Sequence, residues 1–357
     1  MSEASINKYI IEVNDLKKWY PIKEGVFSRV SGNIKAVDGV SFNIRLGETL
    51  GIVGESGCGK STLGRTLIRS IDPTSGNVIF DGQDITKINK KELKNARNKI
   101  KFIFQDPYAS LNPRMTVKDI IAEPIDIQKT YSSKEERDKK VEEVMEMVGL
   151  NKKYMNRYAH EFSGGQRQRI GIARAMILDP KLVICDEPVS ALDVSVQAKI
   201  INLLKELQRE KKVAYIFISH DLSVVKHIAD RVAVMYLGKI VEISHKKELY
   251  KNPKHPYTKA LFSAIPKIET DYNKDARSNL NNDLNNGLDN ELNNNLYNNF
   301  NNEEEMLLEG DMPSPANPPS GCRFHTRCPI ATELCSLEEP KLKLVGDNHL
   351  TACHFSN

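Results

Sequence analysis

A glycine-rich loop that ends in lysine and serine is the segment with the most specific chemistry. Residues 54–61 read GESGCGKS and fit the pattern GxxxxGK[ST] between an apolar run and a helix-like run. Such a loop turns consecutive backbone N–H groups toward a phosphate, and the next helix adds its positive dipole end. Lys60 would neutralise the β- and γ-phosphates, and the Ser61 hydroxyl would take one Mg²⁺ position. The predicted nucleotide contacts are Gly54, Ser56, Gly57, Cys58, Gly59, Lys60, Ser61 and Thr62.

Two adjacent carboxylates follow another apolar run. Residues 182–187 read LVICDE, a strand-like run that ends in Asp186 and Glu187. Successive strand residues point to opposite faces, but at the end of a strand the chain can turn both side chains toward one ligand. Asp186 would then hold Mg²⁺ through its water shell. Glu187 would act as general base on the attacking water, a role worth about 10²–10⁴ in rate.

A second glycine-rich segment precedes another helix-like run. Residues 162–166 read FSGGQ, and one nucleotide does not need two such loops from one chain. Together with the phosphate loop and the carboxylate pair, this segment resembles the signature motif of ABC ATPases, with Phe162 replacing the commoner leucine. The resemblance implies that the signature of one protomer closes on the ATP held by another. The residues expected to make that contact are Ser163, Gly164, Gly165 and Gln166.

The resemblance to ABC ATPases also assigns roles to isolated polar residues. It implies that Gln105 belongs to the Q-loop and attends Mg²⁺, that residues 190–193 (SALD) form the D-loop, and that His220 is the switch histidine at the γ-phosphate. Taken singly, Gln105 and His220 would be interpreted as ordinary polar residues. The order of five motifs along one chain supports the functional assignment.

An aromatic residue upstream of the phosphate loop is expected to stack on adenine. Residues 16–20 read LKKWY and resemble the A-loop of the same family, with Tyr20 in the stacking position and Trp19 as the alternative. Aromatic residues are also common in strands, so a place in the strand core is a second interpretation of either ring.

Short apolar runs predict the elements that position these motifs. Residues 8–13 and 34–44 look like β segments on either side of a basic connection, residues 21–33. The fully apolar runs 182–186 and 213–219 are typical of buried parallel strands, and the helix-like run 194–210 between them completes a βαβ rhythm. We expect the site at the C-terminal ends of the strands, where open α/β sheets bind ligands.

Residues 134–149 predict an amphipathic helix outside the motifs. Val141, Val144, Met145 and Val148 lie on one face at helical spacing. The overall prediction is an α/β fold. By resemblance it is an ABC ATPase nucleotide-binding domain, with a RecA-like core, an antiparallel β subdomain and a helical subdomain, plus a small C-terminal Cys-rich domain.

Three longer segments narrow the resemblance. The ATP-binding subunits of bacterial oligopeptide/dipeptide ABC importers are resembled by residues 105–117, 187–204 and 251–266. Within the first of these segments, the sequence PYASLNP favours the F-type subunit. The resemblance covers about residues 8–268 and 313–356. The expected domains are an ATPase domain and a C-terminal domain with an Asn-rich insertion that we predict to be disordered. Their bounds are 8–250, 251–357 and, for the insertion, 273–305.

The C-terminal segment carries a cluster of cysteines, Cys322, Cys328, Cys335 and Cys353. Four thiolates can hold zinc or a [4Fe–4S] cluster, a Cys₃His zinc site with His325, His349 or His354 is an alternative, and unliganded thiols are a third. The resemblance to the importers implies the [4Fe–4S] cluster. We expect such a cluster to be structural and to lie away from the ATP site.

Charge and hydropathy limit the partners. Lys and Arg number 51 against 47 Asp and Glu, a net charge of +4 that is too small for a nucleic-acid binder. Without a membrane-spanning apolar run or a signal pattern, we expect a cytosolic chain. The resemblance implies a heterodimer with a paralogous D-type ATPase, two permease subunits, an extracytoplasmic peptide-binding protein, and a peripheral place on the cytoplasmic face of the membrane.

Two other classes of ABC protein compete with a transporter subunit. Repair ATPases separate the phosphate loop from the signature by a long insertion, whereas Lys60 and Ser163 are about a hundred residues apart, and translation factors usually carry two cassettes. Non-catalytic regulatory modules tend to lose residues such as Glu187 or His220, and both are present. Peptide import powered by ATP hydrolysis is therefore the expected function, with cargo selectivity in other polypeptides.

Overall fold

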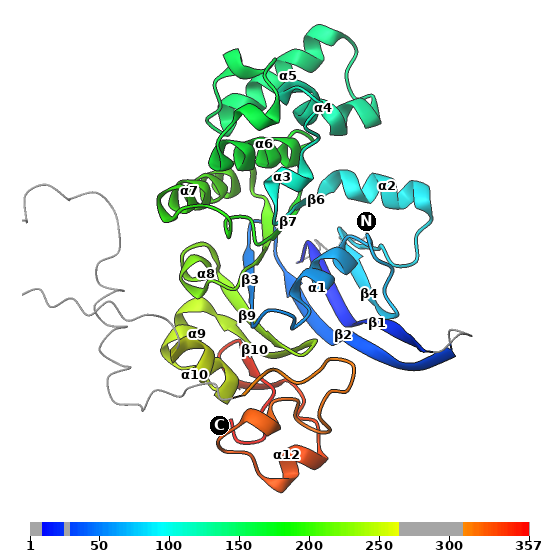
Figure 1. Cartoon of the computed structure of the whole chain (residues 1–357), viewed down its shortest axis with the longest axis vertical. Coiled ribbons are helices and arrows are strands. Elements are labelled where there is room, and N and C mark those ends of the chain that lie inside the picture. Colours follow the sequence, from blue (N-terminus) through cyan, green and yellow to red (C-terminus); the bar gives the residue numbers. More distant parts are fainter. Residues whose placement is uncertain (1–8, 25–28, 264–309, 357) are drawn as a thin grey trace, which may run out of the picture.

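The structure is a computed structural model. Its larger sheet has eight strands and is mixed parallel and antiparallel (Figure 1). The structure describes residues 9–24, 29–263 and 310–356. The strands are β3 (Thr49–Val53), β6 (Ile100–Ile103), β7 (Leu182–Asp186), β8 (Ala214–Ile218), β9 (Arg231–Tyr236), β10 (Lys239–His245), β11 (Lys343–Gly346) and β12 (His349–Thr351). Their order is β11-β12-β10-β9-β3-β8-β7-β6. Neighbours from β9 to β6 are parallel, and the pairs from β9 to β11 are antiparallel.

Side chains of the parallel strands alternate between two hydrophobic cores. Val183 and Cys185 of β7 belong to one core, and Leu182 and Ile184 belong to the other. Every residue of β3, β7 and β8 is buried because both faces of the sheet are covered. The covering helices include α1 (Lys60–Leu67), α7 (Val194–Lys211) and α8 (Leu222–Ile228). The predicted buried parallel strands and the helix between them are confirmed.

A second, antiparallel sheet covers one of these cores. It contains β1 (Ile11–Glu24), β2 (Arg29–Ile44), β4 (Ser75–Phe80) and β5 (Gln83–Asp84), in the order β2-β1-β4-β5. The prediction of a connection over residues 21–33 was wrong, because β1 and β2 pair along their whole length. Pro21 is tolerated there because the pairing of β1 with β4 ends at Lys17, so only one side of Pro21 faces a neighbouring strand.

The helices between β4 and β7 include a group that packs together. They are α2 (Lys90–Lys99), α3 (Pro107–Ser110), α4 (Val117–Gln128), α5 (Lys134–Met147) and α6 (Gly164–Met176), with 3₁₀ turns at Lys152–Tyr154 and Ala159–Glu161. Figure 1 shows α4, α5 and α6 packed together at the end of the molecule opposite the C-terminus. The predicted amphipathic helix is confirmed as α5, which buries Val141, Val144 and Met145. Arg137 joins α5 to Asp119 and Asp126 of α4.

The C-terminal part of the chain is joined to the larger sheet. After α9 (Lys246–Lys251) and α10 (Pro256–Ser263), the described chain resumes at residue 310, and a 3₁₀ turn (His325–Arg327) and α12 (Glu333–Leu337) follow. Strand β12 then pairs with β10, and buried His349 contacts buried Glu242 at 2.6 Å between Nε2 and Oε1. The expected Asn-rich insertion, 273–305, lies outside the described residues. None of the described helices is long and apolar enough to span a membrane.

Candidate active site

The phosphate loop connects β3 to α1 and packs tightly against neighbouring strands. Gly54 and Gly59 have φ values of 152° and 106°, which favour glycine. A Cβ atom would lie 2.1 Å from the Met235 carbonyl oxygen at Gly54 and 2.0 Å from the Ala36 carbonyl oxygen at Gly59. Glycine is therefore required at both positions by conformation and by space.

Lys60 begins α1 and turns back toward the loop. Its Nζ donates to the carbonyl oxygens of Gly54 at 2.7 Å and of Glu55 at 2.9 Å, and the side chain is buried. The Cys58 thiol is also buried, which raises its pKa, and its sulfur lies 3.8 Å from Lys60 Nζ. The ammonium group is thus held against the loop by two of its carbonyl oxygens, as expected for a phosphate-binding lysine.

Ser61 and Asp186 supply a pair of oxygen ligands. The Ser61 hydroxyl donates to Asp186 Oδ1 at 2.9 Å, which joins the start of α1 to the end of β7. Burial raises the pKa of Asp186, although the Ser61 hydrogen bond opposes that shift. A hydroxyl and a carboxylate oxygen at this spacing are the hard ligands that Mg²⁺ prefers, so the donor set fits the predicted magnesium ion.

Glu187 is the centre of a second polar group. Its Oε2 accepts a hydrogen bond from Gln105 Nε2 at 3.0 Å and lies 3.2 Å from His220 Nδ1. Glu187 has a φ of 48°, which breaks the alternation of β7 after Asp186. The three side chains follow the adjacent strands β6, β7 and β8, so they meet at the C-terminal edge of the sheet. Within the described part of the chain, Gln105 hydrogen-bonds to Glu187 and not to Ser61 or Asp186.

The signature segment is built around the start of α6. Ser163 and Gln166 form a capping box, in which Ser163 N–H donates to Gln166 Oε1 at 3.1 Å and Gln166 N–H donates to Ser163 Oγ at 3.4 Å. A Cβ atom on Gly165 would lie 2.4 Å from Val196 of α7. Within the described part of the chain, the side-chain hydrogen bonds of Ser163 and Gln166 join these two residues to each other and not to the phosphate loop.

The two upstream aromatic residues differ in their contacts. Trp19 Nε1 donates to Asp38 Oδ1 at 2.9 Å, and Lys35 Nζ lies 5.2 Å from the indole ring. The Tyr20 ring is half-buried, with Lys18 Nζ 5.0 Å from its centre. Trp19 therefore has a structural role between β1 and β2, which leaves Tyr20 as the better candidate for stacking on adenine.

Comparisons with known proteins agree with this geometry. The family model "ABC transporter" matches residues 37–190, and "Oligopeptide/dipeptide transporter, C-terminal region" matches 241–287 and 293–335. The oligopeptide transport ATP-binding protein AppF of Bacillus subtilis is 52% identical over 353 residues, 99% of each chain. The chain belongs to the family of oligopeptide transport ATP-binding proteins, which are ATP-binding subunits of ABC transporters.

Other relatives support the same family. Oligopeptide transport ATP-binding protein OppF of Salmonella typhimurium is 50% identical over 94% of this chain and 93% of the relative. A solved dimeric ATP-binding cassette in a post-hydrolysis state with ADP and Pi has a TM-score of 0.59 and 30% identity. It covers 66% of this chain and 98% of the solved chain, so the ABC ATPase nucleotide-binding fold is confirmed.

The four C-terminal cysteines lie near one another in this family member. Cys322 N–H donates to the Cys335 carbonyl oxygen at 2.7 Å. Burial, reinforced by the charges of the other three cysteines, raises the pKa of Cys322 to about 11. No cysteine is in a disulfide, and the described residues contain no group of three His, Cys, Asp or Glu side chains arranged to hold one metal ion. The structure thus brings the thiols together without forming a single-metal site.

The histidines of the zinc alternative have other partners. His325 Nδ1 lies 2.8 Å from the Cys322 carbonyl oxygen, and His354 Nε2 lies 3.0 Å from the Glu338 carbonyl oxygen. His349 is paired with Glu242. These contacts argue against a Cys₃His zinc site.

The cysteine segment, residues 310–356, contacts the phosphate loop, and the expectation that a cluster would lie away from the ATP site stays a prediction. Arg327, which immediately precedes Cys328, has its Nη1 at 3.0 Å from Oε1 of Glu55 in the phosphate loop. The two residues are 272 positions apart, and no local pattern links them. They meet because β12 pairs with β10 and brings the C-terminal segment alongside β9, whose end lies next to the phosphate loop.

Proposed function

We propose that this chain hydrolyses MgATP at the edge of the sheet formed by β3, β7 and β8, and that the hydrolysis powers oligopeptide import by an ABC transporter. The single observation that carries this proposal is the convergence of Gln105, Glu187 and His220 beside the Ser61–Asp186 pair. Close relatives are named oligopeptide transport ATP-binding proteins.

Each side chain has a defined part in this reaction. Lys60, Thr62 and the loop N–H groups, including those of Gly54, Ser56, Gly57, Cys58 and Gly59, bind the phosphates. Ser61 and Asp186, assisted by Gln105, would hold Mg²⁺, which would supply positive charge to the β- and γ-phosphates when bound. Tyr20 stacks on adenine.

Glu187 and His220 act on the reacting atoms. The water oxygen bonds to the γ-phosphorus while the bond from that phosphorus to the β–γ bridging oxygen breaks, and Glu187 accepts the proton that the water loses. His220, whose side chain is 57% exposed, contacts the γ-phosphate. The exposed imidazole can leave Glu187 and reach a ligand that enters from solvent.

The signature residues complete the ATP site of a partner ATPase. The start of α6 is formed by Ser163, Gly164, Gly165 and Gln166, and the capping hydrogen bonds of Ser163 and Gln166 are to each other and not to the phosphate loop of their own chain. The N-terminus of α6 would face the partner's phosphates with its N–H groups. A paralogous D-type subunit is the proposed partner, because the resemblance is to the F-type member of such a pair.

The membrane partners are two permease subunits and, through them, an extracytoplasmic peptide-binding protein. The region after Gln105 is the proposed contact, because Phe104 and Tyr108 are exposed on either side of it, at 44% and 64%. The proposed position of the chain is peripheral, at the cytoplasmic face of the membrane. We expect no nucleic-acid partner.

For the domain organisation, we propose an ATPase domain, 8–250, followed by a small Cys-rich domain, 251–357. Its four cysteines, Cys322, Cys328, Cys335 and Cys353, would hold a [4Fe–4S] cluster, with zinc as the alternative. Support comes from the four neighbouring thiols, which match the ligand number of such a cluster. When bound, the cluster would cross-link the segment covalently.

Isolation from membranes tests the transport function. A tagged full-length chain, extracted in mild detergent, is expected to bring down two permeases and a second ATPase subunit, and the complex should hydrolyse ATP. A control chain with Lys60→Ala should assemble in the same way but lack hydrolysis. Recovery with DNA or ribosomes instead of permeases would reject peptide import.

A further inference from the structure

The geometry points to Arg327 as a positioning residue for the phosphate loop: it neutralises and holds Glu55, so that the loop accepts the anionic phosphates of MgATP. This inference rests on the proposed function. The cysteine segment would then support the phosphate loop from behind, and none of its residues would touch the nucleotide.

The ion pair between these residues is largely shielded from water. Arg327 Nη1 lies 3.0 Å from Glu55 Oε1 and 3.3 Å from Oε2, and the exposed fractions are 6% for the arginine side chain and 27% for the glutamate. Tyr236 contributes its hydroxyl at 3.5 Å from the same Nη1. Salt screens such a pair less than an exposed one, and removing one partner leaves the other charge uncompensated.

The backbone of Glu55 is held from the same direction. Its N–H donates to the Tyr257 hydroxyl at 2.9 Å, and Tyr257 is completely buried. Tyr236, Tyr257 and Phe324 of the cysteine segment pack together, with ring centres 4.7 to 5.4 Å apart. An aromatic cluster that includes the cysteine segment therefore supports both the side chain and the backbone of Glu55.

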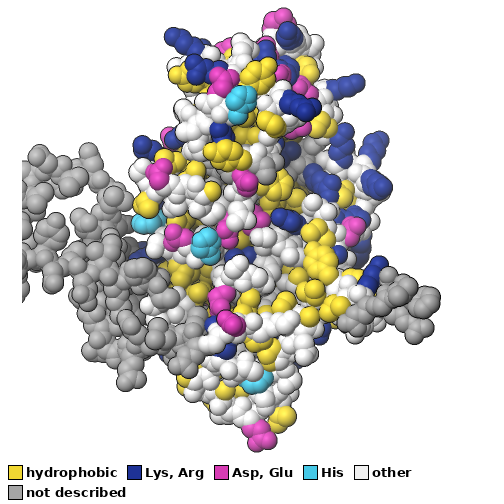
Figure 2. Space-filling model, in the orientation of Figure 1, with side chains coloured by type: hydrophobic (Ala, Val, Ile, Leu, Met, Phe, Trp, Pro, Cys, Tyr) yellow, Lys and Arg dark blue, Asp and Glu magenta, His cyan; other side chains and the backbone are white. Residues whose placement is uncertain are grey.

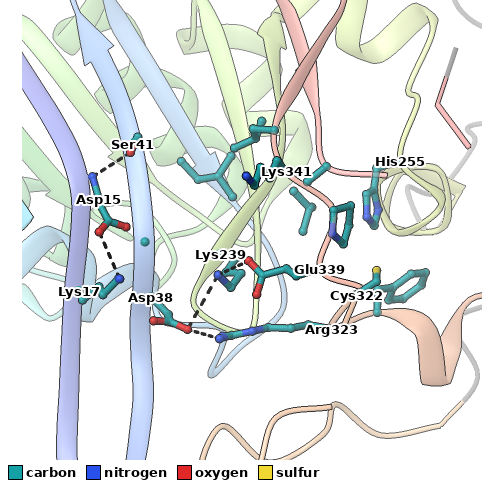
Figure 3. Close-up of a pocket in the computed structure, with 17 residues that line it drawn as sticks. Asp15, Lys17, Asp38, Ser41, Lys239, His255, Cys322, Arg323, Glu339 and Lys341 are labelled. Atoms are coloured by element: carbon teal, nitrogen blue, oxygen red, sulfur yellow. Dashed lines mark hydrogen bonds and ion pairs between the residues drawn. The ribbon is translucent and has the colours of Figure 1, made fainter. Parts of the chain in front are cut away.

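Two further contacts join the C-terminal segment to the phosphate loop and to β2. A Cβ atom on Gly57 would lie 3.2 Å from Met312 Cε, and the Pro315 carbonyl oxygen accepts a hydrogen bond from Lys35 N–H at 3.1 Å. Figure 3 shows Arg323 of the same segment reaching Asp38 on β2, beside Lys239 and Glu339. The contact of Arg327 is thus one of several that fix this segment against the ATPase core.

The position of Glu55 matters because its carbonyl oxygen accepts from Lys60 Nζ at 2.9 Å. A shift of Glu55 would displace both the loop backbone and the phosphate-binding lysine. Without Arg327, the free carboxylate would also repel the triphosphate. Arg327 should therefore affect MgATP affinity, whereas the hydrolytic step at Glu187 should be nearly unaffected.

Two single variants and their combination test this inference. Arg327→Gln, Glu55→Gln and the double variant are titrated as full-length protein with a fluorescent ATP analogue and Mg²⁺, and kcat and KM are measured in parallel. Arg327→Gln should weaken binding about tenfold, with kcat changed less than about twofold. The double variant should recover to within about threefold of wild type, because the unpaired carboxylate is gone.

Glu339→Gln is the matched control. It breaks the ion pair of Glu339 with Lys239, at 2.6 Å, which also joins the C-terminal segment to the core but does not touch the loop. Its affinity should equal that of wild type. Unchanged affinity in Arg327→Gln, or a double variant as weak as Arg327→Gln, would overturn the inference. Failure of the wild-type protein to bind MgATP would instead reject the proposed function.

Discussion

At the scale of single residues, Glu187 is the group on which the proposed chemistry depends most directly. It touches Gln105 and His220 and follows the magnesium ligand Asp186, whereas Lys60 bonds to the loop carbonyls on the other side of the site. Its loss should therefore separate catalysis from binding.

Glu187→Gln should bind MgATP with unchanged affinity and lose about 10²–10⁴ in hydrolysis rate, because the amide cannot accept the proton from water. ATP should then hold the variant in a dimer with its partner ATPase, which size-exclusion chromatography detects. Glu206→Gln, on the exposed face of α7, is the control and should behave as wild type. Hydrolysis at the wild-type rate in Glu187→Gln would remove Glu187 from the role of base.

At the scale of elements, the join between α10 and the sheet contains a buried histidine. His255 Nδ1 accepts from Tyr257 N–H at 3.1 Å at the start of α10, and His255 N–H donates to Glu242 Oε2 of β10 at 3.0 Å. Burial lowers the pKa of His255 to about 4, although the nearby Glu242 carboxylate opposes the shift. The folded state therefore holds this ring neutral.

This shift predicts a pH dependence of the free energy of unfolding. Between pH ~6.5 and pH ~4 the unfolded chain binds a proton at His255 that the folded chain does not, so stability is retained above pH ~6.5 and lost as pH falls. The loss should be on the order of 3 kcal/mol over that window. His255→Asn should show a smaller loss in urea titrations across this range.

The control for this measurement is His245→Gln, because His245 is exposed at the end of β10. It should follow the wild-type profile. If His255→Asn loses as much stability as wild type, the acid sensitivity does not come from His255.

At the scale of the whole molecule, the C-terminal segment both extends the main sheet and supports the phosphate loop. In Figure 2 this segment forms the lower end of the molecule and is in contact with the ATPase core. The pairing of β12 with β10 joins the segment to the main sheet. A cluster held by its cysteines would stabilise a segment that has few regular elements of its own, namely β11, β12, α12 and one 3₁₀ turn in the described range.

Protein purified without oxygen should be brown and contain about four irons per chain. Serine at any one of the four C-terminal cysteines should remove the colour and make the segment more sensitive to protease. Cys185→Ser is the control, because Cys185 is buried in β7 far along the chain from this segment. One zinc per chain without a broad visible band would favour the zinc alternative, and neither metal would favour plain thiols.

Local sequence was sufficient to predict the motifs of the ATP site. The loop at 54–61 and the start of α6 at 163–166 are contiguous, and their glycines and caps set the backbone within a few residues. The apolar runs at 182–186 and 213–219 were equally clear, because strands buried on both faces need apolar residues throughout. The α/β fold class and a nucleotide site follow from these local patterns, and ATP hydrolysis and the family follow from the resemblance that the motifs carry.

Only the tertiary structure decided which distant groups meet. The pairing of β1 with β2 converted a predicted connection into strand, because backbone hydrogen bonds to a neighbouring strand outweigh local turn signals. The pairing of β12 with β10 brought Arg327 to Glu55 across 272 positions. Such contacts follow from sheet order and register, which depend on the packing of the whole chain, and the residue types at either position carry no signal of the other.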